Sequence, residues 1–153
     1  KAWIKVANSY TDDDTIITAL TVAARQMLEE YLSISIASKT YTVVLKNLLG
    51  DMEIPYGPII SITSAVDWDG DTLTIDEDYI LSGEDFKRLD TITDYIKLVY
   101  VAGYSTVPEA LKLAIKMQVG YMYEHRGDEL DTLGMSKDAL TVAKIYSRNG
   151  VFI

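Results

Sequence analysis

The sequence of 153 residues contains no cysteine and only one histidine, His125. Without cysteine the chain forms no disulfide framework, thiol nucleophile, zinc finger or iron–sulfur site. A single histidine also excludes a multi-histidine metal centre within one chain. These absences remove several classes of enzyme and metalloprotein, and we expect neither a cofactor nor a bound metal.

Basic residues are also few, with 14 Lys and Arg against 23 Asp and Glu and a formal net charge of −9. Such a chain is poorly suited to wrapping duplex DNA, because basic side chains must neutralise the phosphates. No apolar run approaches the ~20 residues of a membrane span, so we expect no membrane contact. The 48% hydrophobic and 24% charged residues are typical of a folded globular protein.

Three helices are predicted. Asp12-Asp13-Asp14 precedes an apolar stripe that runs from Ile16 to Tyr31, which predicts an amphipathic helix over about 13–32. Thr106 and Glu109 have the spacing of a capping box for a second helix that ends near Gly127. A third helix is expected from Ser136 to Asn149-Gly150.

Between the first two helices the pattern changes to alternating, β-branched residues, which favours strands. The predicted strands cover residues 33–36, 41–45, 59–68, 78–81, 85–89 and 95–101. Asp69-Gly70 predicts a two-residue hairpin turn that places Val66 opposite Leu73. The expected fold is therefore α+β: a single domain, 1–153, in which a small bundle of two to three amphipathic helices carries an antiparallel β-hairpin sheet, inserted after the first helix at about 34–101.

The acidic residues suggest two kinds of metal chemistry, and both are weaker than structural interpretations. The run from Asp67 to Asp78 resembles a calcium loop, but its glycine is at position 4 instead of 6, which favours a solvated hairpin tip. A metal-dependent hydrolase would require Asp12, Asp14, Asp67 or Asp69 to converge in one pocket. Because no catalytic motif is present, we expect that the protein is not an enzyme.

Tyrosine is abundant, with 11 copies, and several lie around the last predicted strand and the second helix. Tyr104, Tyr121 and Tyr123 either cover the edge of the core or form a protein–protein interface, where tyrosine is enriched. The apolar segment Val151, Phe152 and Ile153 poses a similar choice. It either packs on its own core or docks in a groove of a partner.

Four runs, taken in order, give the chain a family resemblance. They are Asp12 to Leu32, Ile54 to Ile62, Val99 to Ile115, and Tyr121 to Arg126. With this order and spacing the chain resembles the head–tail connector (adaptor, head-completion) proteins of tailed bacteriophages and prophages. Those proteins are small, non-enzymatic helical bundles, and some carry a β insertion after the first helix.

The resemblance implies a structural virion protein: a homo-oligomeric ring, dodecameric in the virion, at the head–tail junction. The ring would assemble in the host cytoplasm, dock under the portal protein, and extend the DNA channel to a stopper or tail protein. Val151, Phe152 and Ile153 are the candidates for portal docking, and Tyr104, Tyr121 and Tyr123 for subunit contacts. DNA would pass without specific binding, because negative charge repels phosphate. Another tail-completion or stopper protein is the alternative within the same particle.

Overall fold

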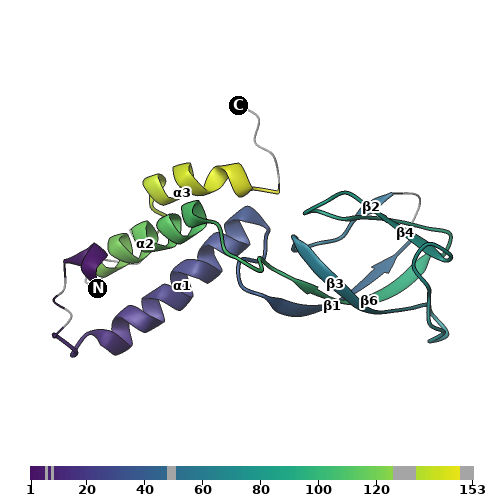
Figure 1. Ribbon diagram of the computed structural model, residues 1–153, viewed down its shortest axis with the longest axis horizontal. Helices are drawn as coiled ribbons and strands as arrows, with labels where there is room; N and C mark the ends of the chain where they lie inside the picture. Colours follow the sequence, from purple (N-terminus) through teal and green to yellow (C-terminus); the bar gives the residue numbers. More distant parts are fainter. Residues whose placement is uncertain (6, 8, 48–50, 126–133, 149–153) are drawn as a thin grey trace. The chain divides into compact units, whose positions relative to one another are not determined.

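The computed structural model describes residues 1–5, 7, 9–47, 51–125 and 134–148. Contacts between residues divide the chain into two units (Figure 1). Unit 1 combines Lys1–Leu32 with Val107–Ile153, and unit 2 is the segment Ser33–Thr106 inserted between them. The predicted α+β class with a β-rich insertion after the first helix is confirmed. That the two units form a single domain stays a prediction.

Unit 1 contains the helices, and α2 packs against both of the others. Their bounds are η1 (Ala2–Ile4, a 3₁₀ helix), α1 (Asp14–Leu32), α2 (Glu109–Glu124), α3 (Lys137–Ala143) and η3 (Lys144–Tyr146, a 3₁₀ helix). The buried side chains between the helices are small or aliphatic, which allows close approach. They are Ala24, Leu28 and Leu32 of α1, Leu111, Ala114 and Val119 of α2, and Ala139 and Ala143 of α3.

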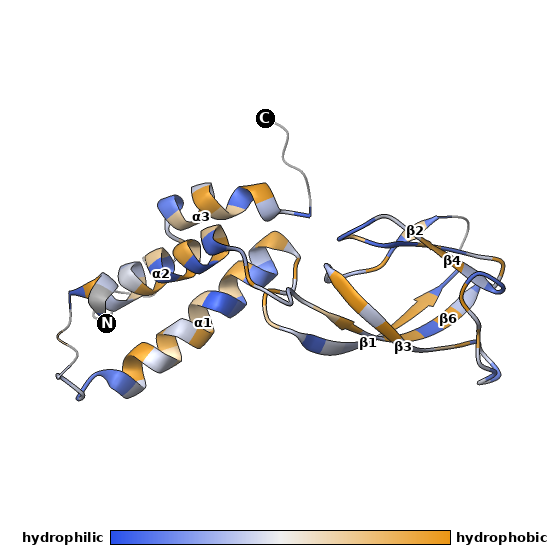
Figure 2. Ribbon diagram, viewed as in Figure 1, coloured by the Kyte–Doolittle hydropathy of each residue, from blue (hydrophilic) through white to orange (hydrophobic). Residues whose placement is uncertain are grey.

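The buried side of α1 is rotated from the predicted stripe. Ile16 and Tyr31 were expected inside, yet they are 45% and 50% exposed. Leu32 takes the place of Tyr31, and Glu29 is also buried. Arg25, one turn earlier, pairs with the Glu29 carboxylate at 2.7 Å, so the buried charge is compensated. Figure 2 shows hydrophobic and polar bands along α1. Some apolar residues are direct neighbours in the sequence, such as Tyr31 and Leu32, and the sequence pattern alone did not decide which of the two faces the core.

The helix starts differ in how well they were predicted. The expected capping box at Thr106 is wrong: α2 begins at Glu109, after Pro108, and no side chain caps it. The start at Ser136 is confirmed, because its hydroxyl accepts a hydrogen bond from the Ala139 amide at 3.4 Å. Helix α2 ends at Glu124, with His125 as its C-cap, just before the end predicted near Gly127. The predicted end of the third helix at 149–150 is wrong: α3 ends at Ala143, η3 continues to Tyr146, and Ser147 is extended.

Unit 2 contains two antiparallel three-stranded sheets. Sheet A has the order β1-β6-β3, with β1 at Lys39–Lys46, β6 at Tyr95–Ala102 and β3 at Ile59–Val66. Sheet B has the order β2-β5-β4, with β2 at Met52–Glu53, β5 at Arg88–Thr91 and β4 at Tyr79–Ser82. The predicted strand at 33–36 is wrong: this segment is irregular, although Ile34 and Ile36 are buried.

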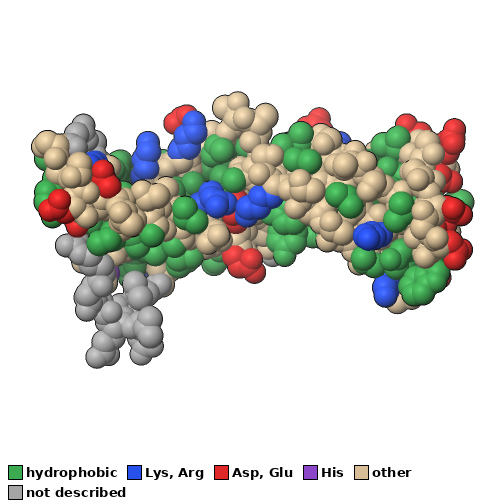
Figure 3. Space-filling model, turned by 90° about the horizontal axis from the view of Figure 1, so that it is seen from below, with side chains coloured by type: hydrophobic (Ala, Val, Ile, Leu, Met, Phe, Trp, Pro, Cys, Tyr) green, Lys and Arg blue, Asp and Glu red, His purple; other side chains and the backbone are tan. Residues whose placement is uncertain are grey.

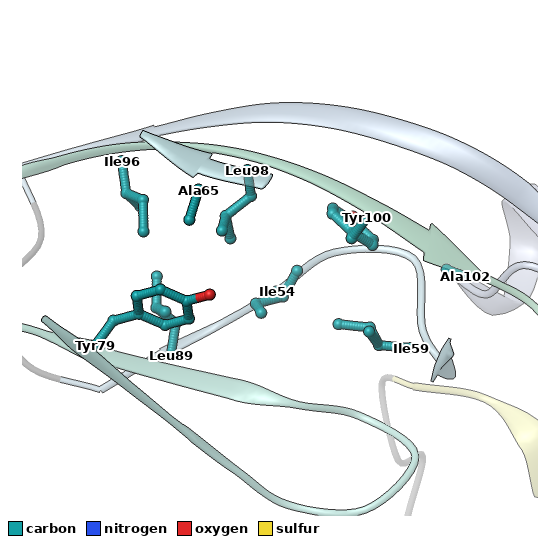
Figure 4. Packing of buried hydrophobic residues seen from close by; sticks show 9 residues of the cluster. All are labelled: Ile54, Ile59, Ala65, Tyr79, Leu89, Ile96, Leu98, Tyr100 and Ala102. Atoms are coloured by element: carbon teal, nitrogen blue, oxygen red, sulfur yellow. The ribbon is translucent and has the colours of Figure 1, made fainter. Parts of the chain in front are cut away.

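The core of unit 2 lies between the two sheets (Figure 4). Inward residues of β6, namely Ile96, Leu98 and Tyr100, are fully buried against Leu89 of β5 and Tyr79 of β4. Alternation along β6 therefore sends its other side chains to the outer face of sheet A.

The hairpin after β3 has a different register from the predicted one. Val66 lies opposite Thr72 instead of Leu73. The Asp67 carboxylate accepts hydrogen bonds from the amides of Asp69, Gly70 and Asp71 at 2.9–3.0 Å. Because Gly70 has φ +92°, the loop closes with three residues and a left-handed glycine, a common hairpin alternative.

Candidate interaction surfaces

Tyr121 lies half-buried near the end of α2. Its ring stacks on His125, with centroids 4.3 Å apart and an interplanar angle of 30°. The Nδ1 atom of His125 also lies 2.7 Å from the Tyr121 carbonyl oxygen. The single histidine thus completes the last turn of a helix.

Tyr123 connects two helices of unit 1. Its hydroxyl donates a hydrogen bond to the carboxylate of Asp13, which immediately precedes α1. The acidic run before α1 therefore fixes a side chain of α2 besides placing negative charge at a helix start. This contact is a structural role for Tyr123 that its spacing in the sequence did not indicate.

Tyr104 belongs to unit 2, whereas Tyr121 and Tyr123 belong to unit 1. It is half-buried, and its amide donates to the Ile36 carbonyl oxygen at 3.4 Å. The predicted docking residues Val151, Phe152 and Ile153 lie outside the described residues. The last described contact before them is the Arg148 amide on the Leu32 carbonyl oxygen at 3.1 Å, which holds the chain at the end of α1.

The acidic residues that suggested a metal site have other partners. Asp14 pairs with the Lys1 ammonium at 2.6 Å, and Asp67 binds the amides of its own turn. Asp12 and Asp14 belong to unit 1, whereas Asp67 and Asp69 belong to unit 2. Among the residues that the structure describes, no three carboxylate or histidine side chains are grouped as metal ligands.

The outer face of α1 is an unusual surface that the sequence analysis missed. Between residues 15 and 22 every exposed side chain is uncharged: Thr15, Ile16, Thr18, Ala19, Thr21 and Val22. A solvated helix face normally carries charge, so this face is suited to contact with another protein. The signal in the sequence was the absence of charge from residue 15 to residue 24. In the described part of the chain, no helix is long and apolar enough to span a membrane.

The negative charge is concentrated in one segment of unit 2. Residues 67–94 contain ten of the 23 acidic residues and two of the 14 basic ones, which accounts for eight of the nine net negative charges. Acidic side chains gather at one end of unit 2 (Figure 3). The pKa of the Tyr79 hydroxyl is raised by burial and, further, by the negative charge of Asp76. By contrast, the strands of sheet A carry three lysines and no acidic residue.

An aromatic cluster marks the end of sheet A next to the acidic hairpin. Trp68 is 71% exposed and meets Tyr95 edge-on, with ring centroids 5.0 Å apart. The Lys46 ammonium lies 5.6 Å and 5.9 Å from the two ring centres, within the range of a cation–π contact.

Strand β3 forms one edge of sheet A, and a groove of about 520 Å³ runs along it. The groove is lined by Ile60, Ile62 and Thr63 of β3 and by Ile75 and Leu81 on its other side. A strand edge beside a groove is a common place for strand addition. Here the bridge between Val66 and Thr72 occupies the end of the edge, and the register shifts of β3 interrupt the rest of it.

The fold is similar to chains in solved structures of a gene transfer agent (GTA) particle. A chain in the neck of the empty particle, computed with C6 symmetry, matches at a TM-score of 0.73 and 15% identity, covering 94% of this chain and 84% of that one. A chain in the native virion matches at 0.71 and 16%, with the same coverage. A chain in the neck of the native particle, computed with C12 symmetry, matches at 0.68 and 17%, covering 86% and 81%.

No protein-family model and no curated protein sequence matches the chain. The TM-scores of 0.68–0.73 show a common fold at identities of 15–17%, and the matches include both the helical unit and the inserted β unit, since they cover up to 94% of the chain. The predicted resemblance to head–tail connector proteins is thereby confirmed at the level of the fold.

Proposed function

We propose that the protein is a structural subunit of the neck of a phage-like particle, where it forms a homo-oligomeric ring. The observation that carries this proposal is the fold likeness to chains in neck structures computed with C6 and C12 symmetry, over 94% and 86% of this chain. Cyclic symmetry requires each subunit to present two different surfaces to its neighbours. The uncharged face of α1 and the outer faces of the β sheets are suitable surfaces for this purpose.

The proposed position is the head–tail junction of the virion, after assembly in the host cytoplasm. The ring docks beneath the portal protein and extends the DNA channel toward a stopper or tail protein. We assign portal docking to Val151, Phe152 and Ile153, because burying three consecutive apolar side chains in a groove of the portal removes apolar surface from water and so favours binding. Duplex DNA passes through the ring without specific binding.

The direct experiment is electron microscopy of the protein mixed with its portal. We expect an added ring of density beneath the portal. A variant lacking residues 151–153 should bind the portal at least tenfold more weakly, with an unchanged thermal unfolding midpoint. Replacing Val151, Phe152 and Ile153 together by serine keeps the chain length and should cause the same loss. Failure of the full chain to form a ring with the portal at any salt concentration contradicts the proposed function.

For the contacts between subunits we propose the outer face of α1 together with the exposed parts of Tyr104, Tyr121 and Tyr123. Val22 is 44% exposed on α1, so Val22→Glu should block ring formation while the monomer stays folded. Gln26→Glu adds the same charge to an exposed, already polar position of the helix and serves as the control. Equal assembly of the two variants would remove α1 from the interface.

A stopper or tail-completion protein is the alternative within the same particle. It would bind to a preassembled ring instead of to the portal alone, so the portal mixture also separates these functions. A metal-dependent hydrolase is the alternative from another class, and it requires carboxylates among Asp12, Asp14, Asp67 and Asp69 to converge in one pocket, although the first two belong to unit 1 and the last two to unit 2.

A further inference from the structure

The two sheets of unit 2 each present exposed aliphatic residues on the side facing away from the shared core. On sheet A, Val44 of β1 is 45% exposed and lies opposite Lys97 of β6. Val99 and Val101 follow on the same side of β6, because its other residues point into the core. This outer face of sheet A therefore combines the valines with uncharged polar residues, among them Thr42 opposite Val99 and Ser61 opposite Val101, and lysine is its only charged residue type.

The outer face of sheet B carries acidic residues, and the arginine on it, Arg88 of β5, forms an ion pair with Asp51 at 2.5 Å. Ile80 of β4 is 55% exposed and pairs across the ladder with Asp90 of β5. Ile92, directly after β5, is 90% exposed, the largest exposure among the large hydrophobic residues described. These side chains surround a shallow hollow of about 90 Å³ that is also lined by Glu77 and Asp78.

We infer that these two faces form a head-to-tail contact between neighbouring copies of the chain, in which Lys97 on sheet A of one copy enters the acidic hollow on sheet B of the next. This inference rests on the proposed ring. The faces belong to opposite layers of the same unit, so one copy can use both at once, as a closed ring requires.

Charge and shape both favour a second copy as the occupant. The stem of Lys97 can lie along Ile80 and Ile92 while its ammonium group reaches the carboxylates of Glu77 and Asp90. The exposed Val44 and the half-buried Val99 and Val101 of sheet A then cover the isoleucines of sheet B, which removes apolar surface from water on both sides. The acidic hollow repels the phosphates of DNA. A partner with a different sequence would not need both faces on one chain.

The test uses charge reversal on each face in the full chain. Lys97→Glu places a carboxylate against the acidic hollow, and Asp90→Lys places an ammonium group against the lysines of sheet A. Each single variant should lower ring formation on the portal at least tenfold, whereas the double variant in one chain exchanges the charges and should recover it. Lys116→Glu, at an exposed position of α2 in unit 1, makes the same charge change as Lys97→Glu and should assemble normally.

The absence of cysteine from the chain permits a second, direct measurement. A variant with Lys97→Cys and Ile92→Cys should give a ladder of covalent oligomers with a short bis-maleimide crosslinker, and a variant with Lys116→Cys and Ile92→Cys should not.

Four outcomes are informative. Rings that form equally well with both single variants overturn it and leave the proposed function intact. Loss of portal binding that the double variant does not recover also overturns it, since the faces would then bind a different protein. If the unmodified chain forms no ring, the proposed function fails first. Recovery by the double variant together with the specific ladder supports the contact.

Discussion

At the scale of single residues, the backbone decides how the chain leaves β6. Gly103 has φ +134°, a conformation that side chains with a Cβ rarely adopt. Its amide donates to the Pro58 carbonyl oxygen at 2.8 Å. A Cβ atom at this position would lie 2.7 Å from the Ala37 oxygen and the Ser38 Cα. The glycine is therefore required both by its torsion angle and by the close passage of a second segment.

Gly103→Ala should lower the free energy of unfolding of the protein by well over ~1 kcal/mol, because an incompatible torsion angle and a backbone collision add together. Gly70→Ala is the matched control. Gly70 also has a positive φ, of +92°, but a Cβ there meets no atom within 4 Å. The control should lose only about 1–2 kcal/mol from the torsion angle. Urea unfolding of both variants measures the difference, and equal losses would show that the close contact contributes nothing.

At the scale of secondary-structure elements, the hairpin after β3 shows how one side chain changes a register. Asp69-Gly70 correctly indicated a turn, but the predicted two-residue loop is one residue too short. A carboxylate that binds three successive amides stabilises a wider loop, and Asp67 supplies it. The dipeptide alone could not distinguish these loops, since both place a glycine at positive φ.

Asp67→Ala should therefore loosen the hairpin, because three amides lose their acceptor. We expect a loss of about 1–2 kcal/mol in stability, as for the removal of a helix cap. Amide hydrogen exchange of residues 69–71 should also become faster. Asp67→Asn retains the oxygen acceptor and should lose much less. If Asp67→Asn loses as much stability as Asp67→Ala, the charge of Asp67 and not its hydrogen bonding stabilises the loop.

The order of the elements was predictable, whereas the side facing the core was only partly so. Helical periodicity located α1 to within one residue, yet Leu32 rather than Tyr31 is buried. The buried Gln118 of α2 was not predictable either. Its amide oxygen accepts from the Ser136 amide at 2.8 Å, and its nitrogen donates to the Gly134 carbonyl oxygen at 3.3 Å. Such contacts depend on which segments meet in space, and the periodicity of apolar residues gives no information about that.

The candidate surfaces were likewise predictable in part from the sequence and in part only from the structure. The abundance and spacing of tyrosine indicate Tyr121 and Tyr123, but their contacts with His125 and Asp13 are visible only in three dimensions. The charge of the two sheet faces was present in the sequence as an acidic segment between lysine-bearing strands. Which face these charges occupy became clear only from the strand register, which places Lys97 on the outer side of sheet A.

At the scale of the whole molecule, the distribution of charge matters more than its total. Outside residues 67–94 the chain is almost neutral, with 13 acidic and 12 basic residues. A uniform excess of acid would serve solubility alone. An excess confined to one end of unit 2 creates a local negative field, and such a field keeps duplex DNA from adhering to the surface that it faces.

If the acidic end of unit 2 faces the channel, reversing its charge should make assembled rings retain DNA. Asp69→Lys with Asp71→Lys changes two exposed carboxylates of the hairpin. Both residues bind Asp67 through their backbone amides, so the substitutions leave these hydrogen bonds in place. Glu30→Lys with Glu124→Lys makes the same change in net charge on exposed positions of unit 1. Co-sedimentation of a short DNA duplex with portal-bound rings should show retention for the hairpin variant only, and it should weaken as salt rises, because lysine–phosphate contacts release counterions. Equal retention by both variants would mean that net charge alone excludes DNA, and no retention by either would place the acidic hairpin away from the channel.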